Sequence, residues 1–404
     1  MWVLYEGSRG NPWNRHPLRV VFPLYADYYE PHDGEGADVS FETGIHTMKR
    51  ILIVSTEKHS GKSLLSLAMG RSFQNRSLKI AYMKPISFEV SYTTGEPLDQ
   101  DAQAVRDLLS VADDIHNIAP VPLEGPFLRE AIESGDHGFR SRIAQAYAAI
   151  AEDRDVAIIE GRNYLGLGVS AGLSDLDLAD LLDADVLLLT QYDGEEAIDR
   201  ILCALRLFES GANILGVVLK DVPTDRSFTW IDEVFVPFLA ERGAEVLGMI
   251  PHDPRFRAVR TDDIVRRLGG RLLTSGHVSH YVRYFVIGSM GVDASLRTFR
   301  RTPDLAVITG ADRHDIQDAA LDVVNLRCLI LTGTERPSRD LLSRADDRGI
   351  PVILAGQNTM MTASVCADML ERVWITPGEM LEAAIQNVRD NVDFARILEK
   401  AADR

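Results

Sequence analysis

The stretch from Ile51 to Ser63, ILIVSTEKHSGKS, constrains the fold of this chain more than any other. It opens with the apolar run Ile51 to Val54, which predicts a buried strand because the run is short, β-branched and bounded by polar residues. A polar turn and Gly61-Lys62-Ser63 follow, and leucines at helical spacing come next. Strand, tight loop, GKS and helix in this order predict a phosphate-binding loop.

Such a loop binds a polyphosphate through its backbone N–H groups, and the positive end of the following helix adds to the attraction. Lys62 is expected to contact the outer phosphates, and Ser63 is expected to offer its hydroxyl to Mg2+. We therefore predict that ATP and Mg2+ bind here. The predicted nucleotide-binding residues of the loop are Thr56, Glu57, Ser60, Gly61, Lys62 and Ser63. Thr56 stands where the usual motif has its first glycine, so a chance GKS at a helix start is the alternative.

Apolar runs and helical patterns alternate along residues 50–251. Further strands are expected at residues 78–83, 156–160, 185–190, 214–219 and 245–250, with helices between them. This alternation predicts an α/β fold of the P-loop NTPase type, with a doubly wound parallel sheet that carries helices on both faces.

After residues 252–254 the alternation restarts and predicts a second, smaller α/β domain. Its strands are expected at residues 282–288, 305–309, 328–332 and 351–354. The predicted domains are therefore an extension over residues 1–47, a P-loop domain over 48–252, the second domain over 253–375 and a C-terminal helical segment over 376–404.

The composition limits the partners and the compartment. The net charge of -17 argues against a nucleic acid or an anionic membrane surface as a partner. No apolar run has the length of a membrane-spanning helix, and the three cysteines show no metal-ligand spacing, which fits the cytoplasm. Residues 1–47 lack a sustained period and a signal-peptide pattern, so we expect a disordered extension, an artefact of start-site choice or a short docking arm.

Two further strand ends carry groups that suit a phosphate site. Lys84 follows the strand predicted at residues 78–83 and is expected to point toward the crevice where α/β proteins bind ligands. An ordinary surface lysine before a turn is the alternative. Glu160 ends the strand Val156 to Glu160, where a P-loop protein places an acidic group that orders Mg2+ or water.

In the second domain, two strands end in Thr309-Gly310 and Thr332-Gly333. Neighbouring strand ends of this kind are expected to form a rim that binds a small-molecule ligand of unknown identity. The alternative is that both glycines only shape turns.

Residues 50–251 resemble the dethiobiotin-synthetase-like group of P-loop proteins. The resemblance rests on four segments, which are the loop Ser55 to Ser63, Tyr82-Met83-Lys84-Pro85-Ile86, Asp101-Ala102 and Ile159-Glu160-Gly161. The loop of that family has Thr at the first motif position, as this chain does at Thr56. It implies that Lys84 binds a substrate carboxylate or carbamate and that Asp101 helps to hold Mg2+. Arg162-Asn163-Tyr164 and Lys220-Asp221 depart from that family's pattern, which leaves the substrate and the base preference open.

Residues 254 to about 370 resemble the DRTGG domain, through Asp312-Arg313, Thr332-Gly333 and Gln357-Asn358-Thr359. This resemblance adds Asp312, Arg313, Thr332 and Gly333 to the predicted binding residues. The domain order resembles the N-terminal regulatory half of long-form phosphate acetyltransferases. We expect the acyltransferase domain of those enzymes to be absent, so that the chain is not a phosphate acetyltransferase by itself.

Different functions fit these features. The first is a regulatory nucleotide sensor that couples ATP and Mg2+ binding to a ligand or partner of the DRTGG-like domain, and this is the one we favour. The second is a ligase-type enzyme in which Lys62 and Lys84 are catalytic, Ser63, Asp101 and Glu160 hold Mg2+, and a small carboxylate or carbamate is phosphorylated. A scaffold that has lost its nucleotide ranks lowest, and a homodimer is plausible under each view.

Overall fold

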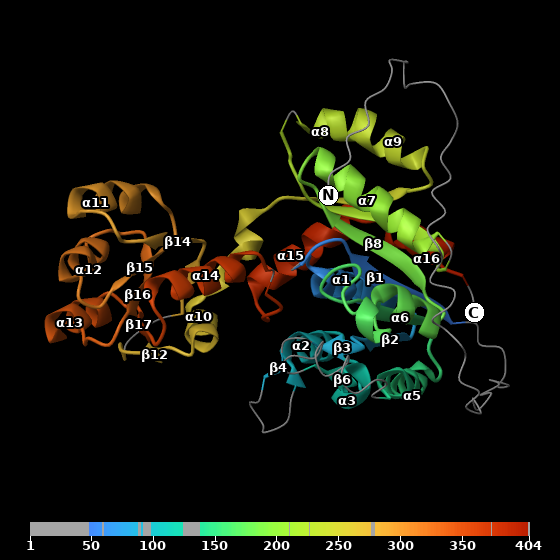
Figure 1. Ribbon diagram of the computed structural model, residues 1–404, viewed down its shortest axis with the longest axis horizontal. Helices are drawn as coiled ribbons and strands as arrows, with labels where there is room; N and C mark the ends of the chain where they lie inside the picture. The colour runs from blue at the N-terminus through green and yellow to red at the C-terminus, as the bar shows by residue number, and fades with distance from the viewer. Residues whose placement is uncertain are drawn as a thin grey trace, which may run out of the picture. The chain divides into compact units, whose positions relative to one another are not determined.

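The computed structural model describes residues 48–58, 60–87, 90–91, 98–123, 138–209, 211–225, 227–275, 279–372 and 374–402. Their helices and strands are drawn in Figure 1. The predicted N-terminal extension, residues 1–47, lies outside the described residues.

A six-stranded parallel sheet organises the first part of the chain, in the order β10-β9-β8-β1-β7-β2. Its strands are β1 (Lys49–Ser55), β2 (Ile80–Met83), β7 (Val156–Glu160), β8 (Asp185–Gln191), β9 (Ile214–Val222) and β10 (Val246–Pro251). Side chains of β1 alternate between two hydrophobic clusters, with Ile51 and Ile53 in one and Leu52 and Val54 in the other. Burial on both faces explains why the sequence of β1 is a continuous apolar run.

Helices cover both faces of this sheet, so the predicted doubly wound architecture is confirmed. The face that contains Ile51 and Ile53 is packed by α1 (Lys62–Gln74), α2 (Gln100–Leu108), α3 (Ile115–Ile118), α15 (Glu379–Asn391) and α16 (Phe394–Lys400). The other face is packed by α5 (Phe139–Ala151), α6 (Asp175–Leu181), α7 (Glu195–Phe208) and α9 (Val236–Ala240). In the chain, α8 (Ser227–Trp230) and a π-helical turn (Ile231–Phe235) directly precede α9. Short strands β3 (Ile86–Ser87), β4 (Val90–Ser91), β5 (Leu98–Asp99) and β6 (Val121–Pro122) and a 3-10 turn (Val169–Ala171) lie in the connections.

A five-stranded sheet forms the second α/β domain, in the order β12-β17-β16-β15-β14. Its strands are β12 (Arg271–Leu272), β14 (Tyr284–Ile287), β15 (Leu305–Gly310), β16 (Leu326–Thr332) and β17 (Val352–Ala355), of which only β12 runs antiparallel to its neighbour. One face is packed by α10 (Thr261–Leu268) and α14 (Thr359–Leu370), and the other by α11 (Val292–Arg301), α12 (His314–Leu321) and α13 (Arg339–Asp347). A 3-10 turn (Pro254–Arg257) and the pair β11 (Val259–Arg260) and β13 (Tyr281–Val282) precede and flank this sheet.

After this second sheet the chain returns to the first one. Leu381 and Ile385 of α15 and Ile397 of α16 are buried in the same cluster as Ile51 and Ile53 of β1. The C-terminal helical segment is broken after Asn391, because Asp393 caps α16 by accepting a hydrogen bond from the backbone N–H of Arg396 at 2.9 Å. The second domain is therefore joined at both of its ends to segments that complete the first core.

Candidate nucleotide-binding site

The phosphate-binding loop ends in a residue with left-handed backbone geometry. Gly61 has φ of 86° and directly precedes α1, and its carbonyl accepts the first helical hydrogen bond, from Leu65 N at 3.0 Å. A side chain would strain this conformation, which explains the glycine. The first turn of α1 carries no acidic residue, so its free N–H groups keep their attraction for an anion.

Adjacent strand ends bring the other predicted groups to this loop. Because β1, β7 and β2 are neighbours in the sheet, the loop after β1, Glu160 at the end of β7 and Lys84 after β2 lie side by side. They line one cleft with about 760 Å³ of space, part of it open to solvent. The predicted residues in its lining are Ser60, Gly61, Lys62, Ser63, Lys84, Asp101 and Glu160.

Glu160 is held by two hydroxyl groups. Ser63 Oγ donates to Glu160 Oε2 at 2.9 Å, and the buried Tyr82 hydroxyl donates to Glu160 Oε1 at 2.8 Å. Burial and the neighbouring Glu160 carboxylate raise the pKa of Tyr82 well above its usual value, so Tyr82 remains a donor. Tyr82 therefore fixes the orientation of the carboxylate that faces Ser63.

The donor set fits Mg2+ bound together with a polyphosphate. Mg2+ prefers oxygen ligands and is usually held by one or two carboxylates plus substrate phosphates and waters. Ser63 and Glu160 supply a hydroxyl and a carboxylate next to the loop. Within the described part of the chain, no group of three or more His, Cys, Asp or Glu side chains could hold a metal, so the phosphates would have to complete the site.

Lys84 is paired with Asp99, a residue for which the sequence predicts no role in the site. Its Nζ lies 2.8 Å from Asp99 Oδ2 and 3.0 Å from Asp99 Oδ1, and the Asp99 side chain is only 2% exposed. Burial by itself would lower the pKa of Lys84, but the carboxylates of Asp99, Asp101 and Glu160 raise it above the usual value. Lys84 is therefore a permanent cation in the cleft, and Asp99 also caps α2 through Ala102 N at 2.8 Å.

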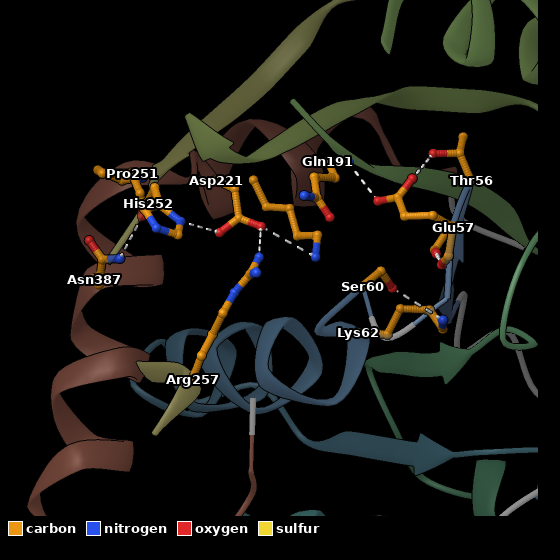
Figure 2. A network of polar contacts seen from close by, with 12 residues as sticks. Thr56, Glu57, Ser60, Lys62, Gln191, Asp221, Pro251, His252, Arg257 and Asn387 are labelled. Carbon is orange, nitrogen blue, oxygen red and sulfur yellow. Dashed lines mark hydrogen bonds and ion pairs between the residues drawn. The ribbon is translucent and has the colours of Figure 1, made fainter. Parts of the chain in front are cut away.

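Lys62 differs from Lys84 in that its hydrogen-bond partner is a neutral hydroxyl and not a carboxylate. Its Nζ donates to Ser60 Oγ at 3.3 Å (Figure 2). Burial lowers the pKa of Lys62 to about 8, although the Asp175 and Glu160 carboxylates oppose this shift. A bound phosphate would restore the charge of Lys62 by supplying the missing negative partner.

Asp175 is a fully buried carboxylate behind the loop, and no motif in the sequence indicates it. It begins α6 and accepts a hydrogen bond from Arg162 N at 2.6 Å, and burial raises its pKa to about 6. A Cβ at Gly161 would lie 2.6 Å from Asp175 Oδ1 and 2.8 Å from the Ile53 carbonyl. Gly161 is therefore required after β7, because the backbone at this position packs directly against Asp175 and β1.

Thr56 and Glu57 are placed differently from Lys62 and Ser63. In Figure 2 their side chains lie next to Gln191, at the end of β8. Glu57 Oε1 accepts from Gln191 N at 2.6 Å, its Oε2 lies 3.8 Å from Arg200 Nε, and Thr56 donates to Glu57. Neither side chain is in the cleft lining. Both side chains instead anchor the loop to the end of β8.

Next to the cleft lies a second polar cluster at the ends of β9 and β10. Asp221 has φ of 57°, and its carboxylate contacts His252 Nδ1 at 3.0 Å and Arg257 (Figure 2). The Lys220 ammonium lies 3.5 Å from the same carboxylate. A pocket that shares Ser60 and Gly61 with the cleft extends to this cluster. The Lys220-Asp221 pair, which departs from the dethiobiotin-synthetase pattern, therefore borders the space beside the phosphate loop.

The four residues predicted in the second domain also gather at one sheet edge. Asp312 and Arg313 follow β15. Thr332 is the last residue of the neighbouring β16, and Gly333 follows it. Thr332 Oγ1 lies 2.7 Å from Thr359 Oγ1, while Arg313 pairs with Asp315 at 3.0 Å. The predicted ligand of this edge remains a prediction.

The cleft contains two more residues that no local pattern indicated. Arg372 and Trp374 come from the segment between α14 and α15, yet they line the same cleft as Lys62 and Glu160. Nothing in their sequence neighbourhood resembles a binding motif. Their place depends on how the chain returns from the second sheet to the first.

Residues 49–260 match a family described as an AAA domain. The chain belongs to this AAA-domain family. Residues 263–369 match the family described as a DRTGG domain, which follows the AAA domain directly. Both matches confirm the predicted P-loop domain and the predicted DRTGG likeness.

Relatives confirm the predicted resemblance to phosphate acetyltransferases and dethiobiotin synthetase. The chain is 26% identical over 366 residues to phosphate acetyltransferase of Pseudomonas putida, which covers 86% of this chain and 51% of that protein. It is 19% identical over 206 residues to the ATP-dependent dethiobiotin synthetase BioD of Methanocaldococcus jannaschii, across 50% of this chain and 92% of that protein. The chain thus spans about half the length of the phosphate acetyltransferase that it matches.

Among solved structures, the septum site-determining protein MinD complexed with Mg-ADP, from Pyrococcus horikoshii, is similar at 14% identity and a TM-score of 0.33. The similarity covers 52% of this chain and 84% of MinD. In the described part of the chain, no helix combines the length and the apolar character needed to cross a membrane.

Proposed function

We propose that this protein is a regulatory nucleotide sensor, in which the AAA domain binds ATP with Mg2+ and the DRTGG domain responds to that binding. The observation that carries the proposal is the return of α15 and α16 into the core of the AAA domain. Arg71 of α1 pairs with Glu382 of α15 at 2.6 Å, so the helix that begins at the phosphate loop is bound to the segment that leaves the DRTGG domain. The C-terminal end of the DRTGG domain is therefore attached to the helix that starts at the phosphate loop.

The outgoing connection supports the same proposal. Arg257, between the two domains, binds the Asp221 carboxylate beside the cleft. A nucleotide that fills the adjoining pocket would contact this cluster and change the position of the connection. Such a differential contact is what a coupling free energy between two sites requires.

Nucleotide binding itself is supported by the cleft. The cleft brings together Lys62, Ser63 and Glu160, which are a cation, a hydroxyl and a carboxylate of the kinds that a polyphosphate and Mg2+ need. The ligand of the DRTGG domain, a homodimer and a cytoplasmic location remain predictions.

The second candidate is a ligase-type enzyme that phosphorylates a small carboxylate or carbamate. It is favoured by Lys84, a cation that lines the same cleft as Lys62, as substrate capture would require. The close pairing of Lys84 with Asp99 favours the sensor, because a substrate anion would have to compete with a buried carboxylate at 2.8 Å.

Titration calorimetry of the full chain with ATP, with and without Mg2+, tests the proposal when phosphate release is followed in the same samples. Mg2+-dependent binding without steady release, together with ATP-dependent hydrogen-exchange protection of α14, is the expected result. Steady release that small carboxylates stimulate, and that Lys84→Ala abolishes while ATP still binds, would establish the ligase instead. If no nucleotide binds, both candidates are wrong.

A further inference from the structure

The short segment between α14 and α15 connects three different parts of the molecule. Arg372 lines the phosphate cleft. Trp374 packs against the hydrophobic cluster of the DRTGG domain that contains Cys366 and Met369, and its Nε1 donates to the Met369 carbonyl at 3.2 Å. Ile375 is 7% exposed and belongs to the cluster of the AAA domain that contains Ile51.

These contacts fix where the Arg372 guanidinium lies. The buried Ile375 anchors the segment on the AAA domain, and the guanidinium carbon lies 5.7 Å from the centre of the Trp374 ring. Contact with an aromatic face at this distance is attractive for a cation. Arg372 is thus held at the cleft by neighbours from both domains.

The electrostatic environment of Arg372 is that of the predicted phosphate site. Burial raises the pKa of Asp101, the carboxylate that lines the cleft beside Lys84, and the positive charges of Lys84 and Arg372 oppose this rise. A guanidinium offers a planar fork of N–H donors that matches phosphate oxygens, and it remains charged at any working pH. Lys62 and Lys84 are single-point cations, so Arg372 adds a different geometry to the cleft.

We propose that Arg372 is a nucleotide-binding residue whose guanidinium contacts the outermost phosphate of a nucleoside triphosphate in the cleft. This inference rests on the proposed nucleotide-binding function. Because Trp374 is packed on the DRTGG domain and Ile375 on the AAA domain, a movement of Arg372 toward the phosphate shifts the segment that joins them. Arg372 therefore distinguishes the triphosphate from the diphosphate, and Trp374 transmits the difference to the DRTGG domain.

The test compares ATP and ADP affinities of the full chain, by titration calorimetry in the presence of Mg2+, for wild type, Arg372→Gln, Arg372→Lys and Arg336→Gln. Arg336 is exposed in the DRTGG domain and outside the cleft lining, so Arg336→Gln is a matched loss of one positive charge. Arg372→Gln should weaken ATP about tenfold or more and change ADP less than threefold, since a charge-assisted contact to the outer phosphate is lost. Arg372→Lys should recover part of the ATP affinity, and Arg336→Gln should change neither ligand.

Tryptophan fluorescence provides the second readout. ATP should change the emission of wild type more than ADP does, and this difference should be absent from both Trp374→Phe and Arg372→Gln. Far-ultraviolet circular dichroism of each variant checks that the fold is retained.

Different failures lead to different conclusions. If Arg372→Gln binds ATP as wild type does while Lys62→Ala loses binding, the nucleotide site is correct and the role of Arg372 is wrong. Equal losses for ATP and ADP would also overturn the contact with the outermost phosphate. If wild type binds neither nucleotide, the proposed function fails together with this inference.

Discussion

Ser63 Oγ donates a hydrogen bond to Glu160 Oε2 at 2.9 Å, although the two residues lie 97 positions apart in the chain. The bond joins the first turn of α1 to the end of β7, and Tyr82 holds the same carboxylate from the other side at 2.8 Å. A hydroxyl and an oriented carboxylate at this distance from each other form part of an oxygen ligand set for Mg2+. The arrangement predicts how ATP binding should depend on the metal.

Glu160→Gln should weaken ATP binding about tenfold when Mg2+ is present and much less when it is absent. The amide keeps the shape and can still accept from Tyr82, but it removes the charge that attracts the metal. Titration calorimetry with and without Mg2+ measures the difference. Tyr82→Phe is the comparison variant, because it removes a hydrogen bond that orients Glu160 but keeps the negative charge of the carboxylate. An equal loss with and without Mg2+ in Glu160→Gln would contradict the metal role.

Lys62→Ala should weaken ATP binding by about 1.5–3 kcal/mol, because a charge-assisted contact to the outer phosphates is removed. Lys58→Ala is the control from the same loop, since the Lys58 ammonium lies 5.5 Å from the Tyr164 ring and is not in the cleft lining. Calorimetric titration of both variants with ATP and Mg2+ measures the effect. If Lys62→Ala binds ATP as tightly as wild type, the phosphate-loop assignment is wrong.

Lys84→Met should destabilise the AAA domain by about 3 kcal/mol, because it leaves the buried Asp99 carboxylate without its ion-pair partner. Replacing Asp99 by Asn in the same chain should recover much of this loss, since Asn can still cap α2. Urea unfolding of the two single variants and the double variant gives the coupling. Additive losses would show that the pair is not energetically coupled.

Asp175 predicts a specific dependence of stability on pH. Its pKa in the folded protein is about 6, above the usual value of 3.8, so the folded state binds the proton more tightly than the unfolded state. The stabilising effect of this proton is fully present below about pH 4 and is lost as the pH rises through about 6. Asp175→Asn does not titrate at this position. When the pH is lowered from 7.5 to 4.5, the free energy of unfolding of wild type should therefore rise by on the order of 1–3 kcal/mol relative to that of the variant.

Urea unfolding midpoints at several pH values measure this difference. Asp180→Asn, at an exposed position on the same helix, is the matched control and should stay within about 0.5 kcal/mol of wild type. A difference between wild type and Asp175→Asn that does not change with pH would show that Asp175 titrates normally.

Local patterns predict the parallel strands of both sheets and the strand ends of the cleft. β1, β7 and β8 are continuous apolar runs, and the cleft residues Lys62, Lys84 and Glu160 follow strands that the sequence predicts. α14 was missed because its sequence, TMMTASVCADML, has no clear apolar stripe, and α10 was missed because it is short and strongly charged. β12 has only two residues, too few for any periodic signal.

The remaining site residues depend on contacts between distant segments. Asp175 is recognisable only as the start of a capped helix, and its burial beside Lys62 results from the packing of α6 on the sheet. Arg372 reaches the cleft because the chain leaves the first sheet, forms a second one and returns. No pattern within a few residues of either position contains that information.

The return of the C-terminal helices predicts that they stabilise the AAA domain, although they follow the DRTGG domain in sequence. Leu381 in α15 is 2% exposed and packs in the cluster that contains Ile51 and Phe73. Leu381→Ala should therefore cost about 2–5 kcal/mol, because it leaves a cavity in that core. Val324→Ala, at a position 87% exposed in the DRTGG domain, should change stability by less than about 0.5 kcal/mol. Urea unfolding midpoints, with and without ATP, measure both variants, and ATP should raise each midpoint by binding the folded state. A Leu381→Ala midpoint well below that of wild type would show that α15 supports the nucleotide-binding fold, whereas a wild-type midpoint would show that α15 does not belong to this core.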